Sequence, residues 1–108
     1  MTSYEFMRIV LMFDLPVITK TQKNIYTRFR KFLLKKGYLM LQYSIYVKLF
    51  PNRDAATRHI RVIKASVPQE GQVRIMMLTE KQYANMEVII GGRSKQEKII
   101  TVDPLIIL

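Results

Sequence analysis

The segment MRIVLMF (Met7–Phe13) is a short apolar run that contains isoleucine and valine, and Asp14, Leu15 and Pro16 close it. A run of this length that stops at a proline is typical of a buried β-strand, because proline cannot donate to a strand ladder and often marks a strand end. The sequence therefore predicts a buried strand that carries a carboxylate at its carboxyl end.

A helix is predicted directly after this strand. Thr19 and Gln22 form a Thr-x-x-Gln capping box. The apolar residues that follow at helical spacing are Ile25, Phe29, Phe32 and Leu33. Lysines in the last turn and Gly37 just beyond them mark the end of an amphipathic helix of about four to five turns.

The next segment, YLMLQYSIYVKLF (Tyr38–Phe50), is predicted to form one long strand with two distinct faces. One face is strongly apolar and contains Leu39, Leu41, Tyr43, Ile45, Val47 and Leu49. The opposite face contains Met40, Gln42, Ser44, Tyr46 and Lys48. The apolar face is expected to lie on the protein core.

The remaining elements alternate between helix and strand. A second helix is predicted from a cap at Asn52 to about Ala65, and its apolar positions are Ala56, Ile60 and Ile63. The elements expected after it are a turn at 68–71, a strand at 73–78, a short helix from a second capping box at 79–82 to about 86, a strand at 88–90, a polar loop at 93–98 and apolar pieces at 98–102 and 105–108.

This order predicts a single domain over residues 1–108 in the α+β class. The expected architecture is a ferredoxin-like βαββαβ antiparallel sheet with its helices on one face and an extra strand within the C-terminal loop and tail, about 93–108. The other face of the sheet is expected to include Met40, Tyr46 and Phe50. These side chains are too apolar to leave in water, so we expect that face to form a homodimer.

The charge of the chain is strongly positive. It contains 18 Lys and Arg against 8 Asp and Glu, which gives a net charge of +10, and most of the excess lies in the first half. A polyanionic partner follows as the first expectation. The absence of cysteine excludes disulfides and thiol chemistry, and His59, as the single histidine, is expected to be a partly buried helix residue. No signal peptide or membrane span is found, so the expected location is the cytoplasm and no membrane partner is expected.

Asp14 is the strongest candidate for a metal-binding or catalytic residue. In a functional interpretation, Asp14 is a ligand for a hard cation such as Mg²⁺. In a structural interpretation, its side chain caps the following turn by accepting hydrogen bonds from backbone N–H groups. Metal-assisted phosphodiester cleavage generally needs more than one carboxylate, and no second acid lies near Asp14 in the sequence. A two-fold dimer would solve this shortage by bringing two copies of Asp14 to one axis.

Basic residues follow the two predicted helices. Three interpretations remain open: a footprint for the phosphate backbone of a nucleic acid, an ordinary solvated helix face, and a membrane-lying helix. The near absence of acids from the first helix favours the phosphate footprint. The candidate nucleic-acid-binding residues are Lys20, Lys23, Arg28, Arg30, Lys31, Lys35, Arg58 and Arg61.

Several strings in the chain match those of a known family. They are VLMFDLP (Val10–Pro16), RFRKFL (Arg28–Leu33), the Gly37–Tyr38 junction, QYSIY (Gln42–Tyr46) and TEKQY (Thr79–Tyr83). In these motifs, and in their order, the chain resembles the "Cas two" family of small CRISPR-associated adaptation proteins, and it is most similar to members from type II systems.

The resemblance implies a ferredoxin-like homodimer that bridges two dimers of the larger "Cas one" integrase and holds double-stranded prespacer DNA during spacer acquisition. It also implies a possible activity, since family members are described as Mg²⁺-dependent endonucleases on RNA or DNA, with the aspartate at position 14 binding metal. A third reading, from another class, is a regulatory ferredoxin-like module that binds only proteins. The apolar tail, Leu105, Ile106, Ile107 and Leu108, is expected to contact either the sister subunit or the integrase.

Overall fold

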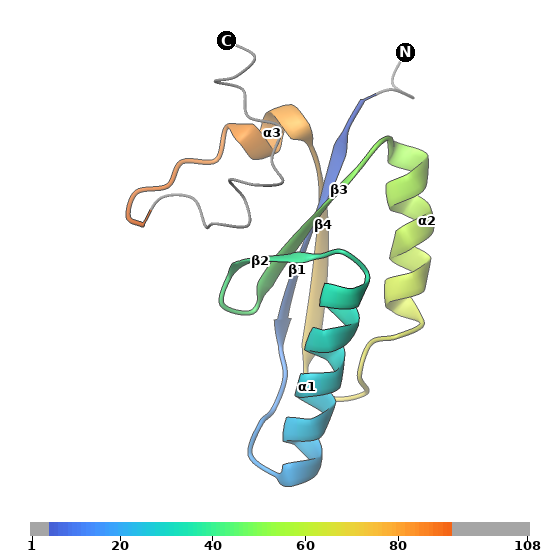
Figure 1. Cartoon of the computed structure of the whole chain (residues 1–108), viewed down its shortest axis with the longest axis vertical. Helices are drawn as coiled ribbons and strands as arrows, with labels where there is room; N and C mark the ends of the chain where they lie inside the picture. The colour runs from blue at the N-terminus through green and yellow to red at the C-terminus, as the bar shows by residue number, and fades with distance from the viewer. Residues whose placement is uncertain (1–4, 92–108) are drawn as a thin grey trace.

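The computed structural model of the chain describes residues 5–91. Within them, four strands form one antiparallel sheet in the order β2-β3-β1-β4 (Figure 1). The strands are β1 (Met7–Asp14), β2 (Leu39–Gln42), β3 (Ile45–Phe50) and β4 (Gln72–Thr79). The helices are α1 (Lys20–Lys35), α2 (Arg53–Lys64) and α3 (Glu80–Ala84). Two βαβ units with this strand order confirm the ferredoxin-like α+β class.

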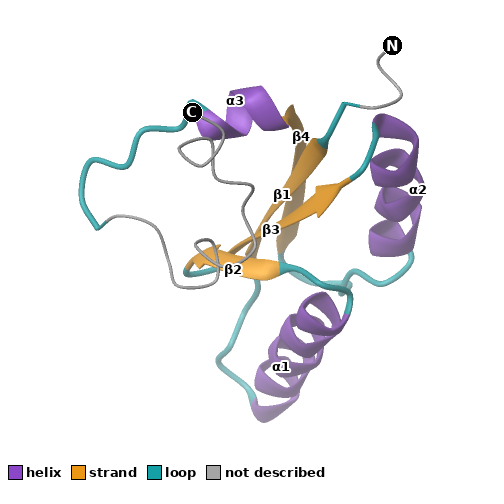
Figure 2. Cartoon of the chain, turned by 45° about the horizontal axis from the view of Figure 1, so that its top comes forward, coloured by secondary structure: helices purple, strands orange, loops and turns teal. Residues whose placement is uncertain are grey.

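The main core lies between the sheet and the two long helices (Figure 2). Alternate residues of β1 point towards the helices, and Ile9 and Leu11 are fully buried there. Phe29 and Leu33 of α1 and Ile63 of α2 cover them. The period of two in the strand and the helical spacing in α1 and α2 therefore produce one continuous apolar layer.

All three predicted helix starts are confirmed, because each has a side chain that satisfies a free backbone N–H group. Thr19 and Thr79 both form complete capping boxes, and the Asn52 side chain accepts from the Ala55 N–H at 2.8 Å. None of the helices within residues 5–91 is long and apolar enough to cross a membrane.

The single long strand predicted over residues 38–50 is wrong. The chain turns back at Tyr43 and Ser44, so the segment is a hairpin of β2 and β3. Ser44 takes a left-handed conformation with φ of 63°, and its carbonyl accepts from the Phe13 N–H at 3.1 Å. The turn contains no Gly, Pro or Asn, and the strand-favouring residues on both sides of it hide it in the sequence.

The expected faces of this segment were also reversed. Tyr46 and Phe50 are 1% and 5% exposed in the core beneath the helices, and Met40 pairs with Tyr46 and shares that side of the sheet. Val47 instead points to the other face. Both faces of β3 are buried, so hydrophobicity alone could not predict which face lies beneath the helices. The Tyr46 ring fills the core there and stacks on the Phe13 ring, with 5.7 Å between the ring centroids.

The strand predicted at 88–90 is also wrong. Val88 is 53% exposed, and Ile89 and Ile90 are 90% and 91% exposed in an irregular segment after α3. Branched residues favour a strand only where a neighbouring strand pairs with them, and within residues 5–91 none lies beside this segment. The predicted loop, the extra strand and the tail Leu105–Leu108 lie outside the described residues.

The face of the sheet opposite the long helices carries a second, smaller cluster. Val10, Val47 and Tyr83 pack there, so that α3 covers this face at one end. Arg8 is 2% exposed beneath α3 and forms an ion pair with Glu80, with nitrogen–oxygen distances of 2.6 and 3.0 Å. Its guanidinium carbon also lies 4.4 Å from the centre of the Tyr83 ring. We call this face the open face, because within residues 5–91 its Asp14 end has no covering helix.

Candidate nucleic-acid interface and carboxylate site

Asp14 lies at the carboxyl end of β1, on the open face and exposed to solvent. Its Cα pairs with that of Gln72, the first residue of β4. The hairpin turn and the start of β4 enclose a shallow cavity of 290 Å³ beside it. The residues that line this cavity are Met12, Phe13, Asp14, Tyr43, Ser44, Ile45, Gln72 and Arg74.

A second carboxylate, which sequence reasoning missed, lies close to Asp14. Glu70 lines an open cavity of 460 Å³ together with Asp14, Gly71 and Gln72. The antiparallel pairing of β1 with β4 brings the residues just before β4 to the end of β1. The position of Glu70 two residues before β4 indicates a site with Asp14 only when β4 is known to pair with β1. The sequence alone does not give this strand pairing.

These two carboxylates fit a site that binds a hard cation through few protein ligands. Mg²⁺ is commonly bound through one or two carboxylates while it keeps several waters. Within residues 5–91, no group of three or more His, Cys, Asp or Glu side chains gathers to hold a metal ion. Asp14 and Glu70 are therefore the residues that would hold Mg²⁺, with the remaining positions left for water, a substrate or a second copy of the chain.

The backbone beside Asp14 depends on Gly71. This residue has φ of +89°, and a Cβ atom at its position would lie 2.5 Å from the Asp14 carbonyl oxygen and 2.8 Å from Leu15 Cδ2. Only glycine takes this conformation at low cost and also allows so close an approach of two backbone segments. Gly71 thus fixes the distance between the end of β1 and the start of β4.

We expect Gly71→Ala to lower the free energy of unfolding by about 2 kcal/mol, because it combines left-handed strain with a backbone clash. Urea denaturation measures this loss. Gly91→Ala is the matched control, since Gly91 has φ of +110° and no atom of residues 5–91 lies within 4 Å of an added Cβ. Equal losses in the two variants would show that the clash with Asp14 contributes nothing.

Aromatic side chains join α1 to the hairpin turn. Tyr43 is 80% exposed at the tip of the hairpin. Burial raises the pKa of Tyr26 on α1, and a hydrogen bond with Tyr43 raises the pKa further. The Tyr26 hydroxyl therefore stays protonated at neutral pH, and its hydrogen bond with Tyr43 links α1 to the cavity beside Asp14, which Tyr43 lines.

The predicted basic residues lie on the helix side of the sheet and have no acidic partners among residues 5–91. Seven of the eight are exposed, and Arg30 is half-buried. Within residues 5–91 the ion pair that the structure contains is that of Arg8 with Glu80, so none of the eight is neutralised by a carboxylate there. The first turn of α1 contains no acid. The positive charge is therefore available to an external anion.

The structure brings some of these cations together and separates others. Arg28, Lys31 and Lys35 lie on one flank of α1, and Arg28 lines a cavity of 290 Å³ beside the loop that follows α2. Lys23 and Arg30 lie on the opposite flank of α1, by the same helical spacing. Arg58 and Arg61 are exposed on α2, which packs on the same side of the sheet as α1.

His59 lies on α2 and is half-buried, as expected. The Tyr38 hydroxyl and His59 Nδ1 are hydrogen-bonded at 3.1 Å. Burial lowers the pKa of His59, and the positive charges of Lys48 and Lys36 lower it further. A neutral imidazole in a basic surrounding is therefore the state of this side chain at pH 7.

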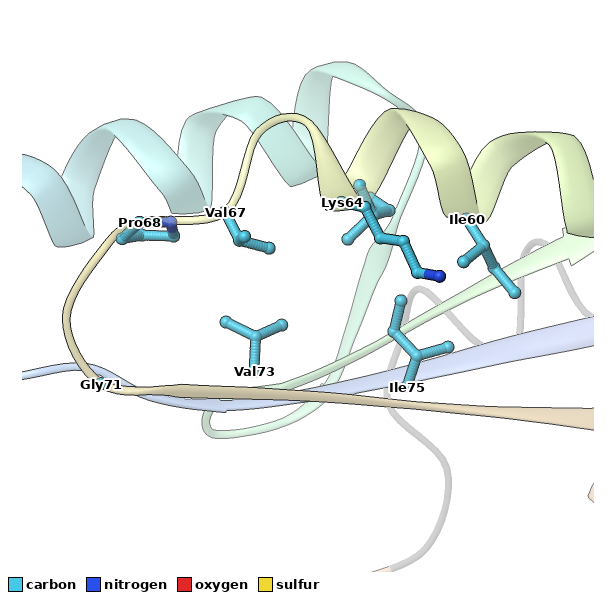
Figure 3. A pocket seen from close by; sticks show the side chains of 8 residues that line it. Ile60, Lys64, Val67, Pro68, Gly71, Val73 and Ile75 are labelled. Carbon is cyan, nitrogen blue, oxygen red and sulfur yellow. The ribbon is translucent and has the colours of Figure 1, made fainter.

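An apolar groove of 540 Å³ lies between the end of α2 and β4 (Figure 3). It is lined by Ile60, Ile63, Lys64, Val67, Pro68, Gly71, Val73 and Ile75. Among the described residues that line it, Lys64 is the one ionisable side chain, and these residues include no carboxylate or histidine that would bind a metal ion. The charged surfaces and the Asp14 end of the sheet remain the candidate site.

The chain is similar to a known protein family and to several of its members. Residues 7–86 match the family described as "CRISPR associated protein Cas2". A relative from Acidovorax ebreus is 45% identical over 92 residues, covering 85% of this chain and 90% of its own length. A relative from Treponema denticola is 44% identical over 102 residues, covering 94% of this chain and 100% of its own length. Both bear the name "CRISPR-associated endoribonuclease Cas2".

A solved structure has a similar fold. It is described as "Crystal structure of cas2", with a TM-score of 0.55 and 21% sequence identity, and the alignment covers 83% of this chain and 91% of that chain. At this identity the likeness concerns the fold alone, and it agrees with the ferredoxin-like sheet described above.

Proposed function

This chain belongs to the Cas2 family of CRISPR-associated proteins, and on that premise we propose that it is a nucleic-acid-binding scaffold subunit of a spacer-acquisition complex. In this proposal a homodimer bridges two dimers of the "Cas one" integrase and holds double-stranded prespacer DNA between them. The partner subunit performs the integration chemistry, and this chain positions the DNA.

One observation supports DNA binding above all others. The cations of α1 and α2, all exposed except the half-buried Arg30, lie on the same side of the sheet and have no carboxylate partners within residues 5–91. Contacts between such side chains and phosphates are independent of sequence and weaken with salt. A subunit that must accept DNA fragments of any sequence needs this kind of contact.

The open face supports the proposed homodimer. Its Asp14 end carries apolar side chains, among them Met12 and the 44% exposed Met76, and within residues 5–91 no helix covers them. A two-fold axis through this end would bury these methionines and bring two copies of Asp14 together. The tail residues Leu105–Leu108 would add a contact to the sister subunit or to the integrase.

A second candidate function is phosphodiester cleavage. The relatives' names describe them as endoribonucleases, and Asp14 and Glu70 line one cavity. Mg²⁺ bound there would polarise a phosphoryl oxygen and lower the pKa of its bound water. In this proposal the two carboxylates hold the ion, and the exposed cations of α1 bind the RNA or DNA strand.

The test compares the wild-type protein with Asp14→Asn in two assays. Fluorescence anisotropy with a labelled DNA duplex is expected to give equal affinities within about twofold, with a steep decrease as salt is raised. Cleavage of RNA and DNA in Mg²⁺ is expected to be lost in the variant, because the ion loses a charged ligand.

The outcomes separate the proposals. Duplex binding that is absent or insensitive to salt would contradict the scaffold proposal and favour a module that binds only proteins. Cleavage that Asp14→Asn leaves at full rate would contradict the Asp14 site. Cleavage lost together with DNA binding would mean that the substitution disturbs the fold, which circular dichroism detects.

A further inference from the structure

We propose that Lys36, Lys48 and His59 form a binding site for one phosphate group of a nucleic-acid backbone. The three side chains come from three elements: Lys36 follows α1, Lys48 lies in β3 and His59 lies in α2. The site deepens the proposed function, on which it rests, because it assigns a specific phosphate contact between the two long helices. None of the three residues is among the eight nucleic-acid-binding residues that the sequence predicts.

A shared contact with the Phe50 ring brings Lys48 and His59 together, and Lys36 lies beside them. The Lys48 Nζ lies 5.5 Å from the centre of the Phe50 ring, and the His59 ring centre lies 5.2 Å from the same ring. The Lys48 Nζ also lies over Gly37, at 2.5 Å from the position of an added Cβ atom. Lys36 directly precedes Gly37, and its Nζ lies 5.9 Å from the centre of the Phe32 ring on α1. Its charge is close enough to His59 to lower the pKa of the imidazole, so it lies beside the Lys48–His59 pair.

The base of this region is a buried tyrosine. Tyr38 is 1% exposed, and its hydroxyl is hydrogen-bonded to His59 Nδ1 at 3.1 Å. Burial raises the pKa of Tyr38, so this hydroxyl stays neutral throughout the physiological range. The imidazole is thus held in place by a buried phenol and by the Phe50 ring before any ligand arrives. A site that is already ordered loses little entropy on binding.

The charges in this region lack a counterion within the described chain. Between residues 5 and 91, no carboxylate forms an ion pair with Lys36, Lys48 or His59. The groups that face the imidazole are the neutral Tyr38 and Phe50 and the cations of Lys48 and Lys36. These cations and burial together keep His59 neutral, and a bound anion would cancel their effect.

Binding of phosphate and protonation of His59 are therefore coupled. The pKa of His59 is lowered in the free protein, and a neighbouring phosphate favours the charged imidazolium and raises the pKa. The bound form accordingly holds more protons than the free form between the lowered pKa of the free form and the higher pKa of the bound form. By linkage, phosphate binding strengthens as the pH falls through this range, by up to about tenfold for each unit of pKa difference.

The test follows the His59 ring protons by NMR, which is direct because His59 is the only histidine in the chain. The pKa of His59 is measured between about pH 5 and 8, at constant ionic strength, with a short DNA duplex, with sulfate or with chloride alone. We expect the duplex to raise the pKa by about one unit and sulfate to raise it less.

Variants assign this response to the site. Lys48→Gln and Lys36→Gln are each expected to lose most of the rise caused by the duplex. Lys81→Gln is the matched control, because it removes one exposed cation on α3, which packs on the opposite face of the sheet from the site, and it is expected to keep the full rise. Lys36 is exposed at the end of α1, so its substitution preserves the fold even if that of Lys48 does not.

The possible failures are distinguishable. If the duplex binds with a salt-sensitive affinity while the pKa of His59 stays constant, the phosphate site is wrong and the proposed function stands. If the pKa of His59 rises equally in Lys36→Gln and Lys81→Gln, the response is general screening and the site is again wrong. If sulfate raises the pKa but the duplex neither binds nor raises it, the nucleic-acid assignment is overturned together with the proposed function.

Discussion

Replacement of Arg28, Lys31 and Lys35 by glutamine is expected to weaken binding of a DNA duplex about 500-fold at about 0.1 M salt. The three side chains are exposed on one flank of α1 and have no carboxylate partner within residues 5–91. Each phosphate contact releases counterions and contributes about 0.9 to the slope of log affinity against log salt. Loss of three contacts lowers the slope by about 2.7, and this accounts for the loss of affinity.

Fluorescence anisotropy over a range of salt concentrations gives both quantities. The double variant with Arg74→Gln and Lys81→Gln is the control, because it removes exposed cations from β4 and α3, away from α1 and α2. For this control variant, we expect the slope of log affinity against log salt to change little for each charge removed. An equal change per charge in the two variants would mean that net charge alone, and no localised footprint, determines DNA binding.

Replacement of Glu80 by alanine is expected to lower the free energy of unfolding by about 3–5 kcal/mol. The variant leaves the guanidinium of Arg8, whose side chain is 2% exposed, without its bidentate partner. A buried charge that loses its counterion costs far more than an exposed one. For a domain of this size, such a loss corresponds to a decrease in melting temperature of roughly 15 °C or more.

Thermal and urea denaturation measure this effect, and Arg8→Met provides the comparison. Methionine fills the space beside Val10 and Tyr83 without a charge, and the 22% exposed Glu80 side chain can be hydrated. We expect Arg8→Met to cost less than Glu80→Ala, and the double variant to be more stable than Glu80→Ala alone. If Glu80→Ala costs less than about 1 kcal/mol, the pair behaves as a surface salt bridge and this account of α3 is wrong.

Features set by neighbouring residues in the chain could be predicted from the sequence. The helix starts at Thr19, Asn52 and Thr79 depend on a side chain that bonds to a backbone group three residues away. The strand that ends at Asp14 depends on an apolar run and a proline. These signals are local, so the order of the elements and the fold class followed from them.

Features set by distant residues could not be predicted. The turn at Ser44 is stabilised by Phe13 of another strand. The apolar run around Arg8 gives no sign of an ion pair, because the partner of Arg8, Glu80, is 72 residues away. The proximity of Glu70 to Asp14 arises from strand pairing. The reversed faces of β3 depend on which aromatic ring fits beneath α1. In each case the deciding contact appears only when the chain is folded.

The length of α1 limits how much DNA one copy of this chain can follow. Sixteen residues at 1.5 Å each make a rod of about 24 Å. At 3.4 Å per base pair, this rod spans about seven base pairs, which is less than one turn of a duplex. Contacts along a longer fragment have to come from a second copy of the helix or from partner proteins, so the length of DNA protected from digestion would report how many subunits are assembled on it.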